Sequence, residues 1–130
     1  MPARIWVVIG IVCLAVLGST LDLTPPPPDP YKVEQQVDRL RAFRAELPPV
    51  SAIGYVSDLP IATTAGSAAF YAAQFALAPI LLEDESNKQH AWILGNFSKQ
   101  QDYAAAGKPL HLVIVKDFGN GVILFRSVAK

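Results

Sequence analysis

Two aspartates are the residues of this 130-residue chain best placed to do chemistry. Asp58 and Asp117 each come directly after a segment that is predicted to be a β-strand. If those strands are parallel neighbours, both carboxylates lie at one edge of the sheet, which is where α/β folds place ligand sites. The sequence therefore offers them as weak catalytic candidates, although no catalytic signature surrounds them.

A hydrolytic triad would also need a nucleophile and a base. His111 alternates with two leucines in a predicted central strand, which favours a structural role, and His90 borders a polar loop where we expect it to be exposed. The chain has no G-x-S-x-G elbow, no phosphate-binding glycine loop and no H-E-x-x-H helix. Asp117-Phe118-Gly119 matches a kinase tripeptide, but no other kinase element is present, so we interpret it as part of a turn.

Metal, cofactor and nucleic-acid sites are not expected. The acidic run at 83–85 lacks the spacing and the glycine of a calcium loop, and we interpret 83–88 as a solvated loop. The single cysteine, Cys13, lies in an apolar run and leaves no disulfide or thiolate site for the remainder. The chain has 11 acidic and 11 basic residues and no basic cluster with interleaved aromatics, which argues against binding to nucleic acid.

The apolar run from Ile5 to Leu23 predicts a membrane anchor in residues 1–23. Arg4 is the one basic side chain before the run and Asp22 lies near its end, so the positive-inside rule places the amino terminus in the cytoplasm and the remainder outside it. A cleaved signal peptide is the alternative, with small residues at 18–20 near a possible cut. Both interpretations place the remainder outside the cytoplasm.

Residues 24–30 form a proline-rich linker, which favours the stiff polyproline II conformation. Residues 31–130 are then sufficient for one compact extracytoplasmic domain and too few for two. The uncharged run from Ile61 to Leu82 is not expected to cross a membrane, because it is rich in alanine and is broken by Pro79.

The pattern of apolar residues predicts an alternation of helices and strands in this domain. Asp29 and Pro30 are suited to the N-cap and first position of a helix whose apolar stripe runs from Val33 to Leu47, with Gln36 and Arg44 at its margin. The further elements expected are a strand at 51–56, a helix at 67–77, strands at 80–82 and 91–94, a short helix from a Ser98–Gln101 capping box to Gly107, and strands at 110–115 and 122–128.

Two features of the last two predicted strands bear on the arrangement of the sheet. Residues 110–115 are apolar at nearly every position, which predicts a central strand covered on both faces. Asn120-Gly121 is typical of a hairpin turn. The expected fold class is α/β, with α+β as the alternative: a mixed sheet of about five strands with flanking helices and a C-terminal β-hairpin. The order of the strands does not follow from the sequence.

The alanine-rich helix at 67–77 carries aromatic side chains on more than one face, so we expect it to be buried in the domain or against a partner. Aromatic and polar side chains supply the candidates for partner contact, which are Tyr55, Tyr71, Gln74, Phe75 and Arg126.

Three stretches carry a resemblance to a known group of proteins: GYVSD at 54–58, the 70–79 segment with Phe70-Tyr71 and QFALAP, and DFGNGVIL at 117–124. They resemble short, uncharacterised, single-pass bacterial proteins that are associated with membrane glycosyltransferases and envelope polysaccharide assembly. The resemblance spans about residues 50–126. It implies a bacterial inner-membrane location and an envelope setting, and it supplies no reaction.

Two functional hypotheses follow. In the first, the chain is a non-catalytic accessory protein that contacts the bilayer through its anchor and a membrane-protein partner through its domain. In the second, it is a small envelope enzyme or glycan-binding domain that uses Asp58 and Asp117. The identity of a partner and the oligomeric state do not follow from the sequence.

Overall fold

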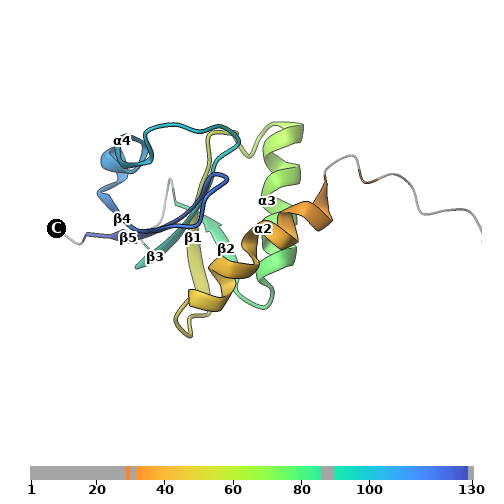
Figure 1. Cartoon of the computed structure of the whole chain (residues 1–130), viewed down its shortest axis with the longest axis horizontal. Helices are drawn as coiled ribbons and strands as arrows, with labels where there is room; N and C mark the ends of the chain where they lie inside the picture. Colours follow the sequence, from red (N-terminus) through yellow and green to blue (C-terminus); the bar gives the residue numbers. More distant parts are fainter. Residues whose placement is uncertain (1–28, 30–31, 86–89, 129–130) are drawn as a thin grey trace, which may run out of the picture.

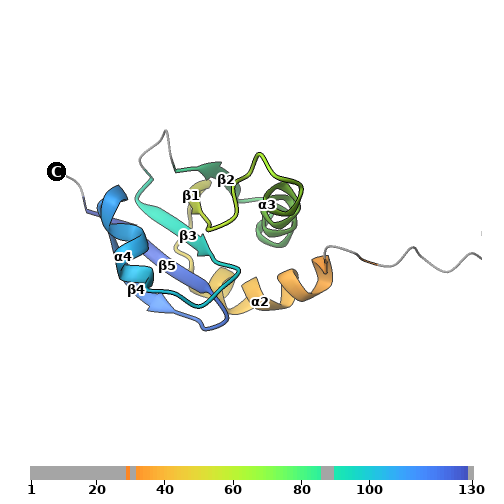
Figure 2. The same cartoon turned by 90° about the horizontal axis from the view of Figure 1, so that it is seen from above.

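The computed structural model describes Asp29 and residues 32–85 and 90–128. In this part of the chain a five-stranded mixed sheet has two long helices on one face and a short helix on the other (Figures 1 and 2). The predicted mixed α/β domain, including its order of helices and strands, is confirmed. The predicted membrane anchor lies outside the described residues, and within them no helix is long and apolar enough to span a membrane.

The helices are α2 (Val33–Glu46), α3 (Thr64–Leu77) and α4 (Tyr103–Gly107), followed by a 3-10 turn η1 (Lys108–Leu110). The strands are β1 (Ala52–Val56), β2 (Leu81–Asp84), β3 (Trp92–Asn96), β4 (Leu112–Asp117) and β5 (Val122–Ser127).

Helix α2 begins later than predicted. Lys32, in the left-handed conformation, precedes its first turn, and the Asp29 carboxylate accepts a hydrogen bond from the Glu34 amide at 3.4 Å instead of capping a helix that starts at Pro30. The apolar stripe behaves as predicted, since Leu40 and Phe43 are fully buried.

Helix α3 packs against α2 through small side chains. Its N-cap is Thr63, whose hydroxyl accepts from the Gly66 amide at 3.0 Å. Ala72, Ala73 and Ala76 are buried, and their small side chains allow close approach of the helix to its neighbours. The side of α3 opposite these buried alanines faces outward from the domain.

The strand order is β2-β1-β3-β5-β4. Strand β1 pairs in parallel with β2 and with β3, whereas β5 pairs antiparallel with both β3 and β4. Strands β1, β3 and β4 therefore run in the same direction, and their carboxyl ends meet at one edge of the sheet. The C-terminal β4–β5 hairpin is as predicted, with Asn120 and Gly121 at positive φ in its turn.

Alternate residues of the strands build a separate core on each face of the sheet. On the α2 and α3 face the largest buried side chains are Leu40, Phe43, Ile53, Tyr55, Leu77, Leu94 and Leu124. On the α4 face they are Ile93, Phe97, Leu112, Ile123 and Phe125. The helices thus form two outer layers around the sheet.

The expectation that residues 110–115 form a covered central strand is wrong. Strand β4 is at the edge of the sheet, and Val113, Ile114 and Val115 are 48%, 41% and 49% exposed. The five-residue helix α4 is too short to cover the strand, and of β4 only Leu112 is buried. Apolar composition alone did not distinguish a covered strand from an exposed one.

Candidate functional site

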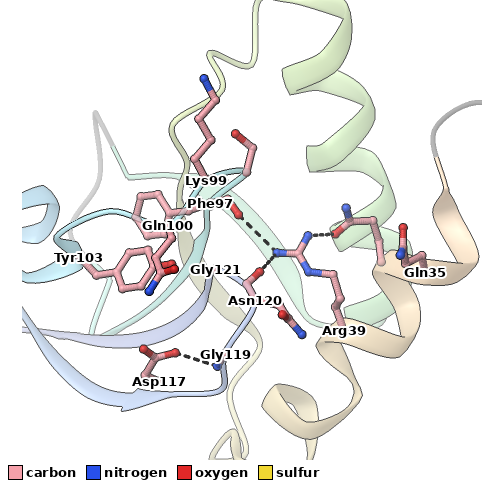
Figure 3. A pocket seen from close by; sticks show the side chains of 12 residues that line it. Gln35, Arg39, Phe97, Lys99, Gln100, Tyr103, Asp117, Gly119, Asn120 and Gly121 are labelled. Atoms are coloured by element: carbon pink, nitrogen blue, oxygen red, sulfur yellow. Dashed lines mark hydrogen bonds between the residues drawn. The ribbon is translucent and has the colours of Figure 1, made fainter.

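A polar cleft of about 630 Å³ lies at the edge where the carboxyl ends of β3 and β4 meet (Figure 3). One wall is the first half of α2, which contributes Gln35, Gln36 and Arg39. The opposite walls are the segment that follows β3, at 97–100 with Tyr103, and the β4–β5 turn at 117–121. The cleft therefore occupies the position in which open α/β sheets bind their ligands.

Arg39 reaches from α2 across to both other walls. Its Nη2 donates to the carbonyl oxygen of Phe97 at 3.4 Å and makes a short hydrogen bond to the carbonyl oxygen of Asn120, while Nη1 donates to the Gln36 side chain at 2.9 Å (Figure 3). The side chain thus ties α2 to the loop after β3 and to the hairpin turn.

All of these acceptors are neutral. Among the described residues Arg39 forms no ion pair, and its Nε is shielded from solvent without an acceptor. Burial lowers the pKa of Arg39 below its ordinary value, and the nearby Tyr55 and Tyr103 oppose this only in part. The guanidinium remains charged at neutral pH, so the cleft contains a cation that no carboxylate of the described residues contacts.

Asp58 and Asp117 do lie at the same edge of the sheet, but their strands are not neighbours, because β3 and β5 lie between them. Asp117 lines the cleft, and its Oδ1 accepts from the Gly119 amide at 2.7 Å, which stabilises the hairpin turn. Asp58 lies behind the cleft wall and accepts two hydrogen bonds from Ser98. Each carboxylate thus has a structural partner, and the two do not form a catalytic pair.

The pKa of Asp58 reflects this environment. Partial burial acts to raise it, but the hydrogen bonds from the Ser98 hydroxyl and from the backbone amides of Ser98, Asp58 and Lys99 outweigh that effect, so the pKa lies below its ordinary value of 3.8. Asp58 is therefore ionised at neutral pH and is a poor general acid.

The proposed partner-binding residues divide into two groups. Tyr55 is only 2% exposed, and its hydroxyl accepts from Asn96 at 3.3 Å. The Gln74 side chain donates to the Ile80 carbonyl oxygen and accepts from the Leu82 amide, at 2.8 and 2.7 Å. The structure therefore gives Tyr55 and Gln74 internal roles.

The other three candidates are accessible. Arg126 is exposed, with its guanidinium over the Trp92 ring at 5.7 Å. Tyr71 and Phe75 are 68% and 71% exposed on the outward face of α3. Together with Val33 they line an apolar hollow of about 430 Å³ between the start of α2 and α3, which we call the α3 hollow.

His90 is not exposed as expected, since its side chain is 14% exposed. Its Nδ1 is 2.7 Å from Glu85 and its Nε2 is 3.0 Å from Glu83, and the Glu85 side chain is almost fully buried against Gly54. The residues predicted to be a solvated loop thus include part of β2 and a buried carboxylate with its histidine partner. This cluster links the end of β2 to the segment that leads into β3.

Two other local expectations need correction. His111 is not in a central strand but is exposed at positive φ before β4. Ser98 does not cap α4, because the N-cap is Asp102, which accepts from the Ala105 amide at 3.0 Å. Arg44, at the margin of the α2 stripe, is exposed and donates to the Ala76 carbonyl oxygen of α3 at 3.1 Å.

Within the described ranges no group of three His, Cys, Asp or Glu side chains is arranged to hold a metal ion. The residue that sequence reasoning missed is Arg39. The only local sign of its role is that it comes three positions after Gln36 on the amphipathic helix α2. The two carbonyl groups that it contacts lie 58 and 81 residues away in the chain.

The fold and the site define a small three-layer mixed α/β domain with a polar cleft at the carboxyl edge of its parallel strands. Comparison with known proteins gives no match to any family model, to any curated protein or to any solved structure.

Proposed function

We propose that this chain is a membrane-anchored accessory protein of the bacterial envelope, without catalysis of its own, whose extracytoplasmic domain docks on a membrane-protein partner. The observation that carries the proposal is the exposure of two large aromatic side chains, Tyr71 and Phe75, side by side on α3. Large exposed aromatics of this kind are typical of the anchors at the centre of protein interfaces.

The position of the α3 hollow supports a partner at the membrane. Val33, the first residue of α2, lines the hollow, so the surface lies where the chain enters the domain from residues 1–32. In the polyproline II conformation that its prolines favour, a seven-residue linker at 24–30 would span about 20 Å. With the predicted anchor before it, the hollow is held within reach of the extracytoplasmic ends of neighbouring membrane helices.

The charge around the hollow favours a protein over the lipid surface. Glu34 and Asp38 lie at its α2 edge, beside Phe75, and Arg41 is paired with Asp38 at 2.6 Å. This edge therefore has no excess of basic side chains, which is what attracts a domain to anionic lipid. An apolar segment of a partner that carries a lysine or arginine at its margin fits both the hollow and its acidic edge.

The resemblance to short single-pass proteins associated with membrane glycosyltransferases is consistent with this proposal and names the kind of partner to seek. The competing hypothesis, an envelope enzyme that uses Asp58 and Asp117, is less favoured because both carboxylates accept hydrogen bonds that hold loops in place.

Site-specific photocrosslinking in cells tests the proposal. A photoreactive amino acid is placed at Phe75 in the full-length chain, and at Ile114 on the exposed edge of the sheet as the control position. We expect one discrete adduct from position 75, identified by mass spectrometry as an integral membrane protein, and no such adduct from position 114. The adduct should disappear on Tyr71→Ser, read from a crosslinker kept at position 75.

Two results would contradict docking through the α3 hollow: the same adducts from both positions, or an adduct from position 75 that Tyr71→Ser leaves unchanged. The anchor is tested separately. The full-length chain should stay in the membrane fraction after an alkaline carbonate wash and keep the mass of its uncleaved sequence, whereas a shorter mass in the soluble fraction indicates a cleaved signal peptide.

A further inference from the structure

The Arg39 guanidinium in the cleft contacts no carboxylate among the described residues. Lys99 and Asp117 also line the cleft, and Asp58 lies directly behind its Ser98 wall. The Arg39 guanidinium contacts neutral oxygens only, and its Nε has no acceptor among the described residues. A partly buried charge is costly unless an opposite charge or a full set of hydrogen bonds compensates for it.

The other side chains of the cleft suit a ligand with hydroxyl groups. Gln35, Gln36, Gln100 and Asn120 line the walls, and each side-chain amide both donates and accepts hydrogen bonds, as a hydroxyl group does. Tyr103, with its ring 5.2 Å from that of Phe97, adds an aromatic surface to the same wall. Figure 3 shows Gln35 on α2, Asn120 in the hairpin turn and Gln100 beside Tyr103, with the Arg39 guanidinium between α2 and the turn.

Size and charge narrow the ligand further. A volume of about 630 Å³ is within the range of small-molecule sites and accommodates one or two sugar units. A carboxylate brings the single negative charge that Arg39 lacks among its contacts. A phosphate dianion would bring a second negative charge close to Asp117.

We infer that the Arg39 cleft binds a polyhydroxylated carboxylate of sugar size, such as a uronic acid, with the carboxylate on Arg39 and the hydroxyl groups on the surrounding side-chain amides. This inference is independent of docking through the α3 hollow, because the two sites use different residues. The bound carboxylate supplies the negative charge that Arg39 lacks. Both Nη2 hydrogens are donated to the Phe97 and Asn120 carbonyl groups and Nε is shielded from solvent, so the ligand carboxylate accepts from the second hydrogen of Nη1.

Binding is measured by isothermal titration calorimetry on the full-length protein in a non-ionic detergent at constant salt. The probes are glucuronate and galacturonate, with glucose, acetate and inorganic phosphate as comparisons. We expect saturable binding of at least one uronate in the millimolar range or tighter, and weaker binding of each comparison by at least about tenfold, because each lacks either the charge or the hydroxyl groups.

Variants assign the binding to the cleft. Arg39→Gln should weaken uronate binding by at least about tenfold, since a charge-assisted contact is lost. Arg41→Gln is the matched control, because it removes the same charge two positions along α2 from a residue that pairs only with Asp38 on the surface. It should leave binding unchanged. If Arg39→Gln is not folded by circular dichroism, the exposed Gln100→Ala, which removes a hydrogen-bonding wall residue, replaces it and should weaken binding severalfold.

Three results would overturn the inference. They are the absence of saturable uronate binding in the millimolar range, binding of glucose, acetate or phosphate as tight as that of the uronates, and equal binding by the wild type and the folded cleft variant.

Discussion

Asp58 and Ser98 are 40 residues apart in the chain and are joined by two hydrogen bonds. The Ser98 amide donates to Oδ1 at 2.7 Å and the Ser98 hydroxyl donates to Oδ2 at 2.6 Å. Asp58 follows β1 and Ser98 follows β3, so this pair fastens the ends of two parallel neighbours. It thereby fixes the wall from which Phe97 offers its carbonyl group to Arg39.

Removal of this pair should destabilise the domain. Asp58→Ala should lower the free energy of unfolding by about 1–2 kcal/mol, and Ser98→Ala by about half of that, because hydrogen bonds to a charged acceptor are lost. Chemical denaturation measures both, and a double-mutant cycle gives their coupling. Asp38→Ala is the control, since Asp38 pairs only with Arg41 at the surface, and it should change stability by less than about 0.5 kcal/mol. Equal losses at positions 38 and 58 would contradict the structural role of Asp58.

The same carboxylate gives a defined pH dependence. The pKa of Asp58 is lower in the folded chain than its ordinary value of 3.8, so the unfolded chain binds the proton more tightly. Its contribution to stability is therefore complete above about pH 5, well above the unfolded pKa, and is lost as the pH falls through the folded pKa. The difference in unfolding free energy between the wild type and Asp58→Asn should shrink from about pH 6 to about pH 3. A difference that is constant with pH would rule out this assignment.

Two glycines of the hairpin turn form a matched pair. Gly119 and Gly121 have φ values of +80° and +79°, so alanine is strained at either position. A Cβ atom on Gly119 meets nothing within 4 Å, whereas one on Gly121 would lie 2.1 Å from the Phe97 carbonyl oxygen. Gly119→Ala should cost about 1 kcal/mol and Gly121→Ala at least about 3 kcal/mol in thermal or chemical unfolding. Similar costs would show that the contact with Phe97 does not constrain the turn.

Gln74 should matter to stability and not to partner binding. Gln74→Leu leaves the Leu82 amide and the Ile80 carbonyl group without the side chain that binds them, which should cost about 2–3 kcal/mol. Gln101→Leu, at an exposed position, should change the unfolding free energy by less than about 0.5 kcal/mol. If Gln74→Leu is folded and stable but no longer gives the position-75 adduct, Gln74 is part of the docking surface.

The edge position of β4 predicts unequal effects of one substitution at two isoleucines. Ile114 on β4 is 41% exposed, whereas Ile123 on β5 is fully buried. Ile114→Thr should lower stability by less than about 1 kcal/mol and Ile123→Thr by about 2–4 kcal/mol, because only the second places a hydroxyl group in the core. Comparable losses at the two positions would mean that a further surface covers β4.

The kinds of elements and their order follow from local patterns in the sequence. The apolar stripe that buries Leu40 and Phe43, and the Asn120-Gly121 turn, are local patterns in which the residue types and spacings decide the backbone conformation. For the same reason the observed boundaries of the elements differ from the predicted ones by only a few residues, as at the start of α2. The sequence predicts that Asp58 and Asp117 lie at one edge of the sheet, but it does not predict the two strands between them.

Which surfaces are covered, and which side chains are in contact, depends on how the elements pack together. An apolar strand such as 112–117 has the same local pattern in the centre of a sheet or at its edge, and the packing of distant helices determines its exposure. The contacts of Arg39 with the carbonyl groups of Phe97 and Asn120, and of His90 with a buried glutamate, likewise join parts of the fold that no local pattern relates. Such contacts depend on how the whole chain packs, so they can be recognised only once the strand order is known.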